Sequence, residues 1–374
     1  MIKTDGALLW KPGTNSGWTV EEIELDPPKN GEVVVQLAAS GMCHSDAHLD
    51  TGDIPIDWAP ILGGHEGAGV IQEVGPNVEG LKVGDHCVLQ FLPTCGKCWF
   101  CVRGQTNLCD MTTNVLSGFA PDGTHRVHAR GVGVGCYSYL GTFSKYVVAH
   151  QASVIKIDDD IPLDVAALVG CGVPTGFGSA AYAAQTEIGD VCVVVGCGGV
   201  GHNAIQGFRI SGADSIMAVD PVPFKQESAK GFGATMTASS VEEAHELLAQ
   251  ATHGRMADRV VVTMGVGNAD MLDSMMKLVR KGGTLVFTNA APMQQLKANL
   301  GMYMFSMSGK RLQGTLYGNC NPRNDIPKLL KLYRRGELLL DELITNRYRL
   351  KDINQGWKDL EEGRNVRGLI DYSS

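Results

Sequence analysis

Residues 191–206 read VCVVVGCGGVGHNAIQ, and this stretch decides the fold. Its leading apolar residues predict a buried strand, and the residues after the glycines have the apolar spacing of a helix. Between them lies the pattern G-x-G-x-x-G as Gly196, Gly198 and Gly201. A glycine-rich turn between a buried strand and a helix is typical of a dinucleotide-binding βαβ unit. The alternative is a purely structural βαβ turn.

The glycines of this turn have different roles in such a unit. Gly196 permits the tight turn, Gly198 lets the backbone approach a pyrophosphate, and Gly201 allows the helix to pack closely on the sheet. The first N–H groups of a helix have no partner inside it. Those of Gly199 and Val200 are therefore expected to face the phosphates.

Asp220 ends the next predicted strand, SIMAVD at residues 215–220. It lies about twenty residues beyond the turn, where a carboxylate can hold the hydroxyls of the adenosine ribose. A 2′-phosphate at this place would meet a like charge. The sequence therefore predicts NAD as the cofactor, in preference to NADP.

Strands and helices alternate from about Pro174 to about Tyr317, which predicts βαβ units and a parallel sheet. The predicted strands are residues 191–196, 215–220, 259–265 and 284–290, and the predicted helices are 198–212, 241–253 and 270–283.

The chain before about Gly170 consists of short β segments broken by glycine and proline, with strands predicted at residues 32–40, 67–75 and 82–91. After the alternating region, helices are predicted at residues 325–338 and 353–363, followed by the β-like segment 366–372. That last segment fits poorly as one more parallel strand. We therefore expect it to return to the first domain.

Composition excludes several classes of protein. The chain has 374 residues, a formal net charge of -8, and 44% hydrophobic and 19% charged residues, which is typical of a soluble globular protein with more than one domain. The acidic balance gives no reason to expect nucleic acid or an anionic membrane as a partner. The start lacks the pattern of a signal peptide, no segment has the length of a membrane span, and eleven cysteines suit a reducing compartment. We expect a cytoplasmic protein.

Four cysteines lie in one short stretch, PTCGKCWFCVRGQTNLC, with the spacing C-x2-C-x2-C-x7-C. Four soft thiolates from one lobe suit a closed tetrahedral Zn²⁺ site, which holds a loop in place and performs no reaction. An iron–sulfur cluster is the alternative, but its usual spacing differs. The predicted structural zinc ligands are Cys95, Cys98, Cys101 and Cys109.

A second group of metal-capable residues is scattered along the chain. Cys43, His65 and Cys171 would form a Cys2His set of ligands. Three protein ligands leave a fourth position for water or substrate, which is typical of a catalytic zinc. The alternative is that Cys171 is a small buried apolar residue and His65 a hydrogen-bonded turn residue.

Together these motifs resemble the zinc-dependent medium-chain alcohol dehydrogenase family, nearly from end to end. The matching segments, in the family's order, are GHEGAGVIQEVG, the four-cysteine lobe, CGVPTG, the glycine-rich unit and the terminal VRGLI. The resemblance implies an α/β fold with a GroES-like β-rich catalytic domain (1–172 and 318–374) and a Rossmann doubly wound NAD-binding domain (173–317). It also implies two zinc ions per chain, one of them catalytic at Cys43, His65 and Cys171.

The resemblance implies roles for residues near the catalytic metal. Ser45 matches the hydroxyl that takes the alcohol proton, and His48 matches the proton exit to solvent. Asp46 would orient the metal ligands. Glu66 matches a buried carboxylate near the metal and is a further candidate ligand, and Phe91 matches a wall of the alcohol pocket. The alternatives are a turn-capping hydroxyl for Ser45, an exposed histidine for His48, a structural acid for Glu66 and a buried strand residue for Phe91.

The resemblance also implies contacts with the cofactor. Thr175 matches a residue beside the nicotinamide, Lys225 a contact of the adenosine ribose, and Arg367 a contact of the pyrophosphate. His44 stands where the family commonly has an arginine next to the pyrophosphate. For Lys225, a solvated helix surface is the alternative.

A narrower resemblance is to the actinobacterial nicotinoprotein branch, the NDMA-dependent alcohol dehydrogenases. It rests on the segments GGVGHNAIQG, VGVGCYSYLGTFSKYVVAH and NPRNDIPKLLKLY. In that branch NAD stays bound through turnover and an external acceptor reoxidises it in place; the peptide-derived carrier mycofactocin is the implied partner. His202 and Asn203 are candidates for added hydrogen bonds that retain the cofactor, the alternative being a solvent-facing helical turn.

The reaction that these resemblances imply is the oxidation of a small-molecule alcohol to an aldehyde or ketone, with hydride transfer to NAD. A thiol-adduct formaldehyde dehydrogenase, an ordinary alcohol dehydrogenase with exchangeable NAD, and a non-enzymatic NAD-binding relative are the alternatives. The sequence does not identify the alcohol.

The segment 299–317, NLGMYMFSMSGKRLQGTLY, is apolar and rich in methionine. It lies where relatives pair their Rossmann sheets edge to edge. Because an unpaired strand edge invites aggregation, we expect a closed homo-oligomer, a dimer or a tetramer. The alternative is an internal strand covered by the chain's own loops.

Overall fold

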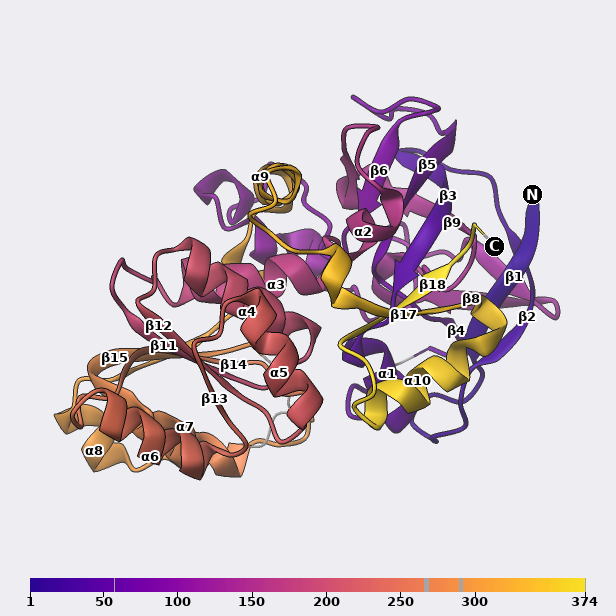
Figure 1. Cartoon of the computed structure of the whole chain (residues 1–374). Helices are drawn as coiled ribbons and strands as arrows, with labels where there is room; N and C mark the ends of the chain where they lie inside the picture. The colour runs from indigo at the N-terminus through magenta and orange to yellow at the C-terminus, as the bar shows by residue number, and fades with distance from the viewer. Residues whose placement is uncertain (57, 266–268, 289–291, 374) are drawn as a thin grey trace. The chain divides into compact units, whose positions relative to one another are not determined.

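The computed structural model describes residues 1–56, 58–265, 269–288 and 292–373. The chain forms two compact units (Figure 1). Unit 1 contains Met1–Cys171, Asn321–Arg335 and Leu340–Ser374, and unit 2 contains Gly172–Cys320 and Gly336–Leu339.

Unit 1 is rich in β-structure. One part is a closed barrel with the order β1-β2-β7-β8-β4, and the other is a sheet with the order β10-β6-β5-β3-β18-β17, in which β9 also pairs with β3. The strands are β1 (Ile2–Leu9), β2 (Thr19–Leu25), β3 (Glu32–Gly41), β4 (Ile61–Leu62), β5 (Gly67–Val74), β6 (His86–Leu89), β7 (Val127–Ala129), β8 (Val132–Cys136), β9 (Tyr146–His150), β10 (Val154–Lys156), β17 (Ile344–Tyr348) and β18 (Arg367–Asp371).

The C-terminal segment is part of this unit. Strand β18, yellow in Figure 1, pairs antiparallel with β3, with Leu369 opposite Gly41. Nearby, the ring of Trp18 lies 5.3 Å from that of Phe143 and 6.2 Å from that of Trp357. Because aromatic rings bury large apolar areas, this cluster joins the beginning, middle and end of the chain in one core.

The helices of unit 1 are α1 (His44–Thr51), α2 (Leu163–Leu168), α9 (Pro322–Arg334) and α10 (Ile353–Glu361). Helix α9 begins earlier than the predicted range because Pro322 occupies its first position and the Asp325 carboxylate accepts the N–H of Asn321. Among the residues that the structure describes, no helix combines the length and the apolar character needed to cross a membrane.

Unit 2 contains a parallel sheet with the order β13-β12-β11-β14-β15-β16. Figure 1 shows α4 and α5 on one face and α6 and α7 on the other. The strands are β11 (Val191–Val195), β12 (Ser215–Val219), β13 (Met236–Ala238), β14 (Ala257–Val262), β15 (Val279–Phe287) and β16 (Arg311–Gly314); the helices are α3 (Gly172–Gly178), α4 (Gly199–Ile210), α5 (Pro223–Phe232), α6 (Val241–Ala251), α7 (Leu272–Lys277) and α8 (Met302–Met307).

Strand β11 is buried along its whole length, as its continuous apolar run predicted. The boundary between α7 and β15 was predicted wrongly. The helix ends at Lys277 and the strand begins at Val279, because Val279 is buried and pairs with Ala257. Residues 289 and 290 of the predicted strand 284–290 lie outside the described residues.

The predicted strand 82–91 is shorter in the structure. Strand β6 covers only His86–Leu89 because Gly84, at a φ of 88°, turns the chain ahead of it. Strand β6 pairs antiparallel with β5, and the chain after β6 continues directly to Phe91 and the four-cysteine lobe.

Candidate active site

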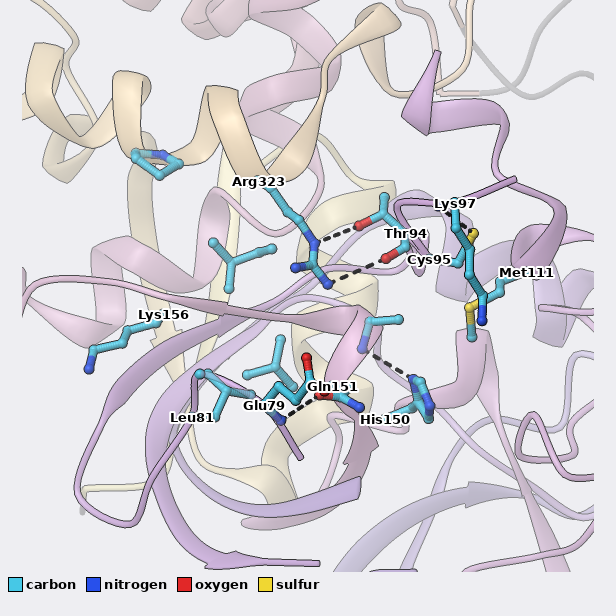
Figure 2. Close-up of a pocket in the computed structure, with 15 residues that line it drawn as sticks. Glu79, Leu81, Thr94, Cys95, Lys97, Met111, His150, Gln151, Lys156 and Arg323 are labelled. Atoms are coloured by element: carbon cyan, nitrogen blue, oxygen red, sulfur yellow. Dashed lines mark hydrogen bonds between the residues drawn. The ribbon is translucent and has the colours of Figure 1, made fainter. Parts of the chain in front are cut away.

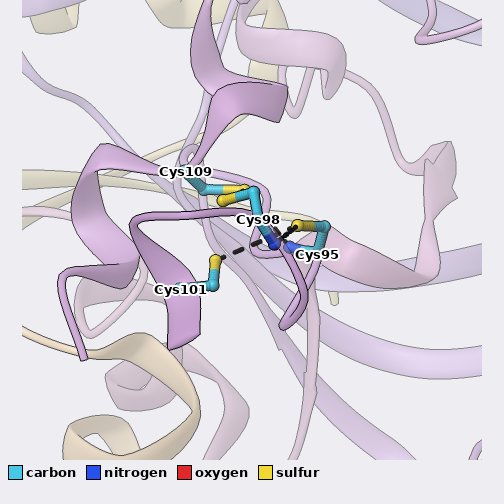
Figure 3. Close-up of side chains that lie close together, drawn as sticks. All are labelled: Cys95, Cys98, Cys101 and Cys109. Atoms are coloured by element: carbon cyan, nitrogen blue, oxygen red, sulfur yellow. Dashed lines mark hydrogen bonds between the residues drawn. The ribbon is translucent and has the colours of Figure 1, made fainter. Parts of the chain in front are cut away.

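The four-cysteine lobe follows β6 and is built from short 3-10 helices, Cys101–Arg103, Thr106–Leu108 and Asp110–Thr112. Figure 3 shows the four sulfur atoms converging, and all lie within 4.8 Å of one another. The Sγ atoms of Cys98 and Cys109 are 3.9 Å apart, and those of Cys95 and Cys101 are 4.0 Å apart. A tetrahedron with Zn–S bonds of about 2.3 Å has S···S edges of about 3.8 Å, so the sulfurs fit zinc.

Backbone groups prepare these thiols for a cation. The N–H groups of Lys97 and Cys98 point at the Cys95 sulfur, at 3.4 and 3.3 Å. Backbone N–H groups of Asp110 and Cys101 lower the pKa of Cys98 to about 6, which makes its thiolate available at neutral pH. A metal needs its ligands deprotonated, so this environment favours binding at Cys98, whereas burial raises the pKa of Cys101 and of Cys109, whose protons a metal would displace.

The second group of metal-capable residues meets where β3 ends and β5 begins. Because Ser40 pairs with Gly67 in antiparallel register, residues just beyond these positions are neighbours. Cys43 caps the start of α1, and His65 and Glu66 directly precede β5. With Cys171 they place four ligand atoms within 4.8 Å of one another, all from buried residues.

The orientation of His65 is fixed by Asp46, which is fully buried. The Nδ1 atom lies 3.2 Å from Oδ1 of Asp46 and 3.1 Å from Oδ2, but only the contact with Oδ1 has hydrogen-bond geometry. The same Oδ1 accepts the N–H of Gly64 at 2.9 Å. Because the carboxylate accepts, Nδ1 carries the proton, and Nε2 is left as the nitrogen for a metal.

The two thiols of this group are coupled. A hydrogen bond from Cys171 holds the pKa of Cys43 well below its ordinary value, and the same bond raises the pKa of Cys171. Burial would lower the pKa of His65, but the charges of Asp46 and Cys43 keep it raised. This Cys2His donor set fits zinc, whose charge would take the place of the shared protons.

Glu66 forms a buried ion pair with Arg367. Burial raises the pKa of the Glu66 carboxyl even though Arg367 opposes the shift. The structure therefore places Glu66 beside Cys43, His65 and Cys171 and also pairs it with Arg367. Both roles considered from the sequence, a metal ligand and a structural acid, agree with this position. The predicted contact of Arg367 with a pyrophosphate stays a prediction.

Helix α1 presents the predicted proton-transfer residues. His44 and Ser45 are partly exposed in its first turn, and Ser45 Oγ lies 3.5 Å from the Cys43 sulfur. The side chain of His48 is 5% exposed, so the exposed histidine considered from the sequence is wrong. Its Nδ1 lies 3.2 Å from Oδ2 of Asp53, whose side chain is 30% exposed. Gly52, at a φ of 85°, turns the chain so that Asp53 returns to His48.

Two aromatic rings stand edge-on to His65. The ring of Phe91 is 5.5 Å from the imidazole, and that of Tyr137 is 5.3 Å from it. Sequence reasoning missed Tyr137 because it begins a buried turn in which Ser138 and Tyr139 have φ values of 54° and 63°. Non-glycine residues adopt such values only where the surrounding structure fixes them, so local sequence gives no signal.

In unit 2 the glycine-rich turn of Gly196, Gly198 and Gly201, called the fingerprint turn below, has the geometry that the three predicted roles of its glycines require. Gly196 has a φ of 96°, and a Cβ there would lie 2.7 Å from the nitrogen of Met264. A Cβ on Gly201 would collide with the carbonyl of Gly196, so the helix packs as closely as glycine allows. At Gly198 a Cβ would meet nothing within 4 Å, which leaves that side of the turn open for a ligand.

Asp220 directly follows β12, and its carboxylate accepts the N–H groups of Cys197 at 2.8 Å and Val222 at 2.9 Å. It is thereby tied to the fingerprint turn. Lys225 is partly exposed in the first turn of α5, and Thr175 lies in α3. Their predicted contacts with the cofactor stay predictions.

His202 and Asn203 are buried, so a solvent-facing helical turn is wrong. The side chain of His202 bonds Gly198 O and Ser228 Oγ, and Asn203 donates to Gly199 O. Their polar atoms thus form hydrogen bonds with the turn itself. The sequence had instead suggested direct hydrogen bonds to the cofactor.

A pocket of about 620 Å³ lies elsewhere in unit 1 (Figure 2). Arg323, on α9, reaches into it and donates to Oγ1 of Thr94 at 3.2 Å. Lys156, also in its lining, is paired with Asp85 at 2.7 Å. Among the described residues, Cys95 is the one predicted site residue in its lining, and Cys43, His65 and Cys171 do not line it.

Comparisons with known proteins agree with this geometry. Residues 29–159 match the alcohol dehydrogenase GroES-like domain, and residues 199–335 match the zinc-binding dehydrogenase domain. An NDMA-dependent alcohol dehydrogenase from Amycolatopsis methanolica is 46% identical over all of this chain and all of its own. Alcohol dehydrogenase B from Mycobacterium tuberculosis is also 46% identical, over all of this chain and 99% of its own.

Solved structures give the same result. The benzyl alcohol dehydrogenase from Acinetobacter calcoaceticus has a TM-score of 0.91 and 28% identity, and a zinc-binding-domain alcohol dehydrogenase from Burkholderia ambifaria has a TM-score of 0.92 and 28% identity, each over 99% of both chains. Domains, sequence and fold together define a zinc-dependent oxidoreductase. The chain belongs to the zinc-dependent medium-chain alcohol dehydrogenase family.

The predicted α/β fold with GroES-like and Rossmann domains is confirmed. The protein is an enzyme whose cofactors are zinc and NAD.

Replacing Asp220 by Asn should narrow the preference for NAD over NADP. The charge that repels a 2′-phosphate is lost, while the amide oxygen keeps an acceptor for the turn. Hydrogen bonds to a charged group contribute about 1.5–3 kcal/mol, so we expect NAD affinity to fall on the order of 10- to 100-fold. Direct titration with both dinucleotides measures this. Equal affinity of the wild-type protein for NADP and NAD would contradict the role given to Asp220.

Proposed function

We propose that this enzyme oxidises small-molecule alcohols to aldehydes or ketones, with hydride transfer to an NAD that stays bound and is reoxidised in place by an external acceptor. The observation that carries the chemistry is the buried group Cys43, His65 and Cys171, with its fourth neighbour Glu66 paired to Arg367. Three ligands of this kind leave a metal position for the alcohol.

When bound, zinc supplies a Lewis acid for the alcohol oxygen and NAD supplies the hydride acceptor. Cys43, His65 and Cys171 would hold the metal, and Asp46 keeps the His65 ring in place by its bond to Nδ1. Ser45 would take the alcohol proton, being the hydroxyl beside Cys43. His48 would pass this proton on toward solvent, with Asp53 as the more exposed partner of the pair.

Retention of NAD is supported by the full-length similarity to an enzyme named as NDMA-dependent. An enzyme that depends on an added acceptor would not exchange its cofactor in each turnover. We infer the same for this chain, with a mycofactocin-type redox carrier as the physiological acceptor. The eleven free cysteines favour a reducing compartment, so we infer a cytoplasmic enzyme.

The purified protein should therefore carry nicotinamide cofactor through gel filtration. Adding alcohol should produce the absorbance of the reduced nicotinamide without added NAD⁺. Turnover should be fast with a nitroso-aniline acceptor and slow with free NAD⁺, because slow release of the cofactor limits exchange. Wild-type protein that is isolated free of nicotinamide and turns over steadily on added NAD⁺ would instead be an ordinary alcohol dehydrogenase.

We also infer a homo-oligomer that pairs at the β16 edge. Strand β16 ends the sheet of unit 2 and is exposed along its length. Large apolar side chains around it are exposed as well, including Met302, Tyr303, Met304, Met307 and Leu312. An exposed strand edge with an apolar surround is a liability that symmetric pairing removes.

Light scattering at micromolar concentration should give at least twice the 39.9 kDa mass of the chain. Changing Leu312 to Lys should shift the mass toward the monomer, because charged residues on an edge strand oppose pairing. Val132, also exposed and apolar but in unit 1, is a matched control as Val132→Lys. A monomeric wild type would contradict the pairing.

A further inference from the structure

Two polar side chains lie behind the fingerprint turn, where a buried helix start would ordinarily carry apolar residues. His202 and Asn203, in the first turn of α4, are 0% and 1% exposed. The Nδ1 atom of His202 is 3.0 Å from the carbonyl oxygen of Gly198, and Asn203 Nδ2 donates to that of Gly199 at 2.8 Å. Both acceptors belong to the turn that the sequence assigns to the pyrophosphate.

The protonation of His202 follows from its partners. A carbonyl oxygen only accepts, so Nδ1 must carry the proton. Burial lowers the pKa of His202 to about 4, so the ring is neutral and Nε2 accepts the hydroxyl of Ser228 at 2.9 Å. Phe232 stands edge-on to the ring at 4.7 Å. Ser228 and Phe232 both lie on α5, so the imidazole connects the turn with that helix.

The orientation of the Asn203 amide is also determined. Gln206 Nε2 donates to Asn203 Oδ1 at 3.3 Å and to the carbonyl of Leu339 at 3.0 Å, while Gln206 Oε1 accepts the Leu339 N–H at 2.7 Å. Since its oxygen is used as an acceptor, Asn203 presents its NH₂ group to Gly199.

Fixing these carbonyls also fixes N–H groups. A peptide unit is planar and trans, so the C=O of Gly198 and the N–H of Gly199 point in opposite directions. The Gly198 carbonyl accepts the backbone N–H of His202 at 2.9 Å, and the imidazole adds a second bond to the same oxygen. A carbonyl held in this way along the helix aims the Gly199 N–H out of the helix start, and the Gly199 carbonyl does the same for the Val200 N–H. Glycine loses more backbone conformational entropy on ordering than other residues do. Because these hydrogen bonds order the turn before the cofactor binds, binding loses less entropy.

We propose that His202 and Asn203 are positioning residues that hold the fingerprint turn in its pyrophosphate-binding shape and thereby slow the release of NAD. The proposal rests on NAD retention as proposed above. It assigns the retention to bonds behind the turn, in place of direct contacts with the cofactor.

The test measures the rate at which the protein, loaded with radiolabelled NAD⁺, loses the label into excess unlabelled NAD⁺. His202→Leu removes both bonds at similar volume. His202→Asn keeps a donor where Nδ1 lies, and His202→Gln keeps a polar atom where Nε2 lies. We expect release about fivefold faster per lost bond, and so about 25-fold faster for His202→Leu. Ser228→Ala should match His202→Asn, and combining the two should add nothing.

The melting temperature of each variant without NAD separates positioning from general stability. A variant that melts earlier but releases NAD at the wild-type rate would show a purely structural role and overturn the proposal, as would wild-type release from His202→Leu. Wild-type protein that is isolated without nicotinamide and then fails to bind labelled NAD⁺ would overturn the proposed function itself. Wild-type protein that binds and releases NAD⁺ quickly, with the variants still ranked as above, would leave the positioning role standing and remove only tight retention.

Discussion

Changing Cys98 to Ser should remove one zinc ion per chain and leave the protein unfolded or aggregated. The four thiols converge within 4.8 Å in a lobe made of short 3-10 helices, which has little regular structure of its own. Binding of a structural zinc contributes on the order of 10 kcal/mol, while a whole domain is stable by only about 5–15 kcal/mol. Metal analysis and circular dichroism measure both effects, and we expect wild-type protein to hold two zinc ions per chain.

Cys136 provides the matched control, because it is a free cysteine outside both groups of metal ligands. Cys136→Ser should keep both ions and most of the stability. Fully active wild-type protein with a single zinc would contradict the two-site prediction, and so would a Cys98→Ser variant that retains both ions.

Changing His65 to Ala should abolish turnover and largely preserve the fold. The metal contributes several kcal/mol to stabilising charge in the transition state, which corresponds to about a 1000-fold loss of rate. The remaining ligands, Cys43 and Cys171, would hold the ion weakly. The rate with alcohol and a nitroso-aniline measures the loss, and metal analysis should show one zinc remaining.

Two further variants calibrate this result. His245 is exposed on α6, and His245→Ala should retain full activity. Asp46→Asn keeps the shape of the group but weakens the bond that orients His65, so zinc affinity should fall about 10- to 100-fold. A His65→Ala variant with wild-type turnover would contradict the assignment of the catalytic metal.

The chemistry of this enzyme could be predicted from sequence wherever function requires particular residue types at particular spacings. Thiolates for zinc and glycines at a phosphate turn have few substitutes, so Cys95, Cys98, Gly196 and Gly201 were found without structural knowledge. The structure brings the four cysteines together and gives each glycine a separate steric reason.

What escaped prediction depends on long-range packing. Tyr137 reaches His65 through a turn with positive φ at non-glycine residues, and Asp53 reaches His48 because Gly52 reverses the chain. Neither contact is indicated by a local sequence pattern. The hydrogen bond between His202 and Ser228 depends on how α5 packs against α4, and the apolar spacing of a helix does not predict that packing.

The pairing of β18 with β3 also determines the order in which the chain can be completed during synthesis. Glu66 is made early, but its partner Arg367 emerges from the ribosome 301 residues later. Unit 2, which needs only Gly172–Cys320 and a few residues after it, has its whole sheet available before the first unit receives its last strand. Domains generally fold in the order of their synthesis, but here the interrupted unit must wait for the end of translation. In a nascent chain the sheet of unit 2 would thus be complete before Arg367 is available to pair with Glu66 beside Cys43, His65 and Cys171.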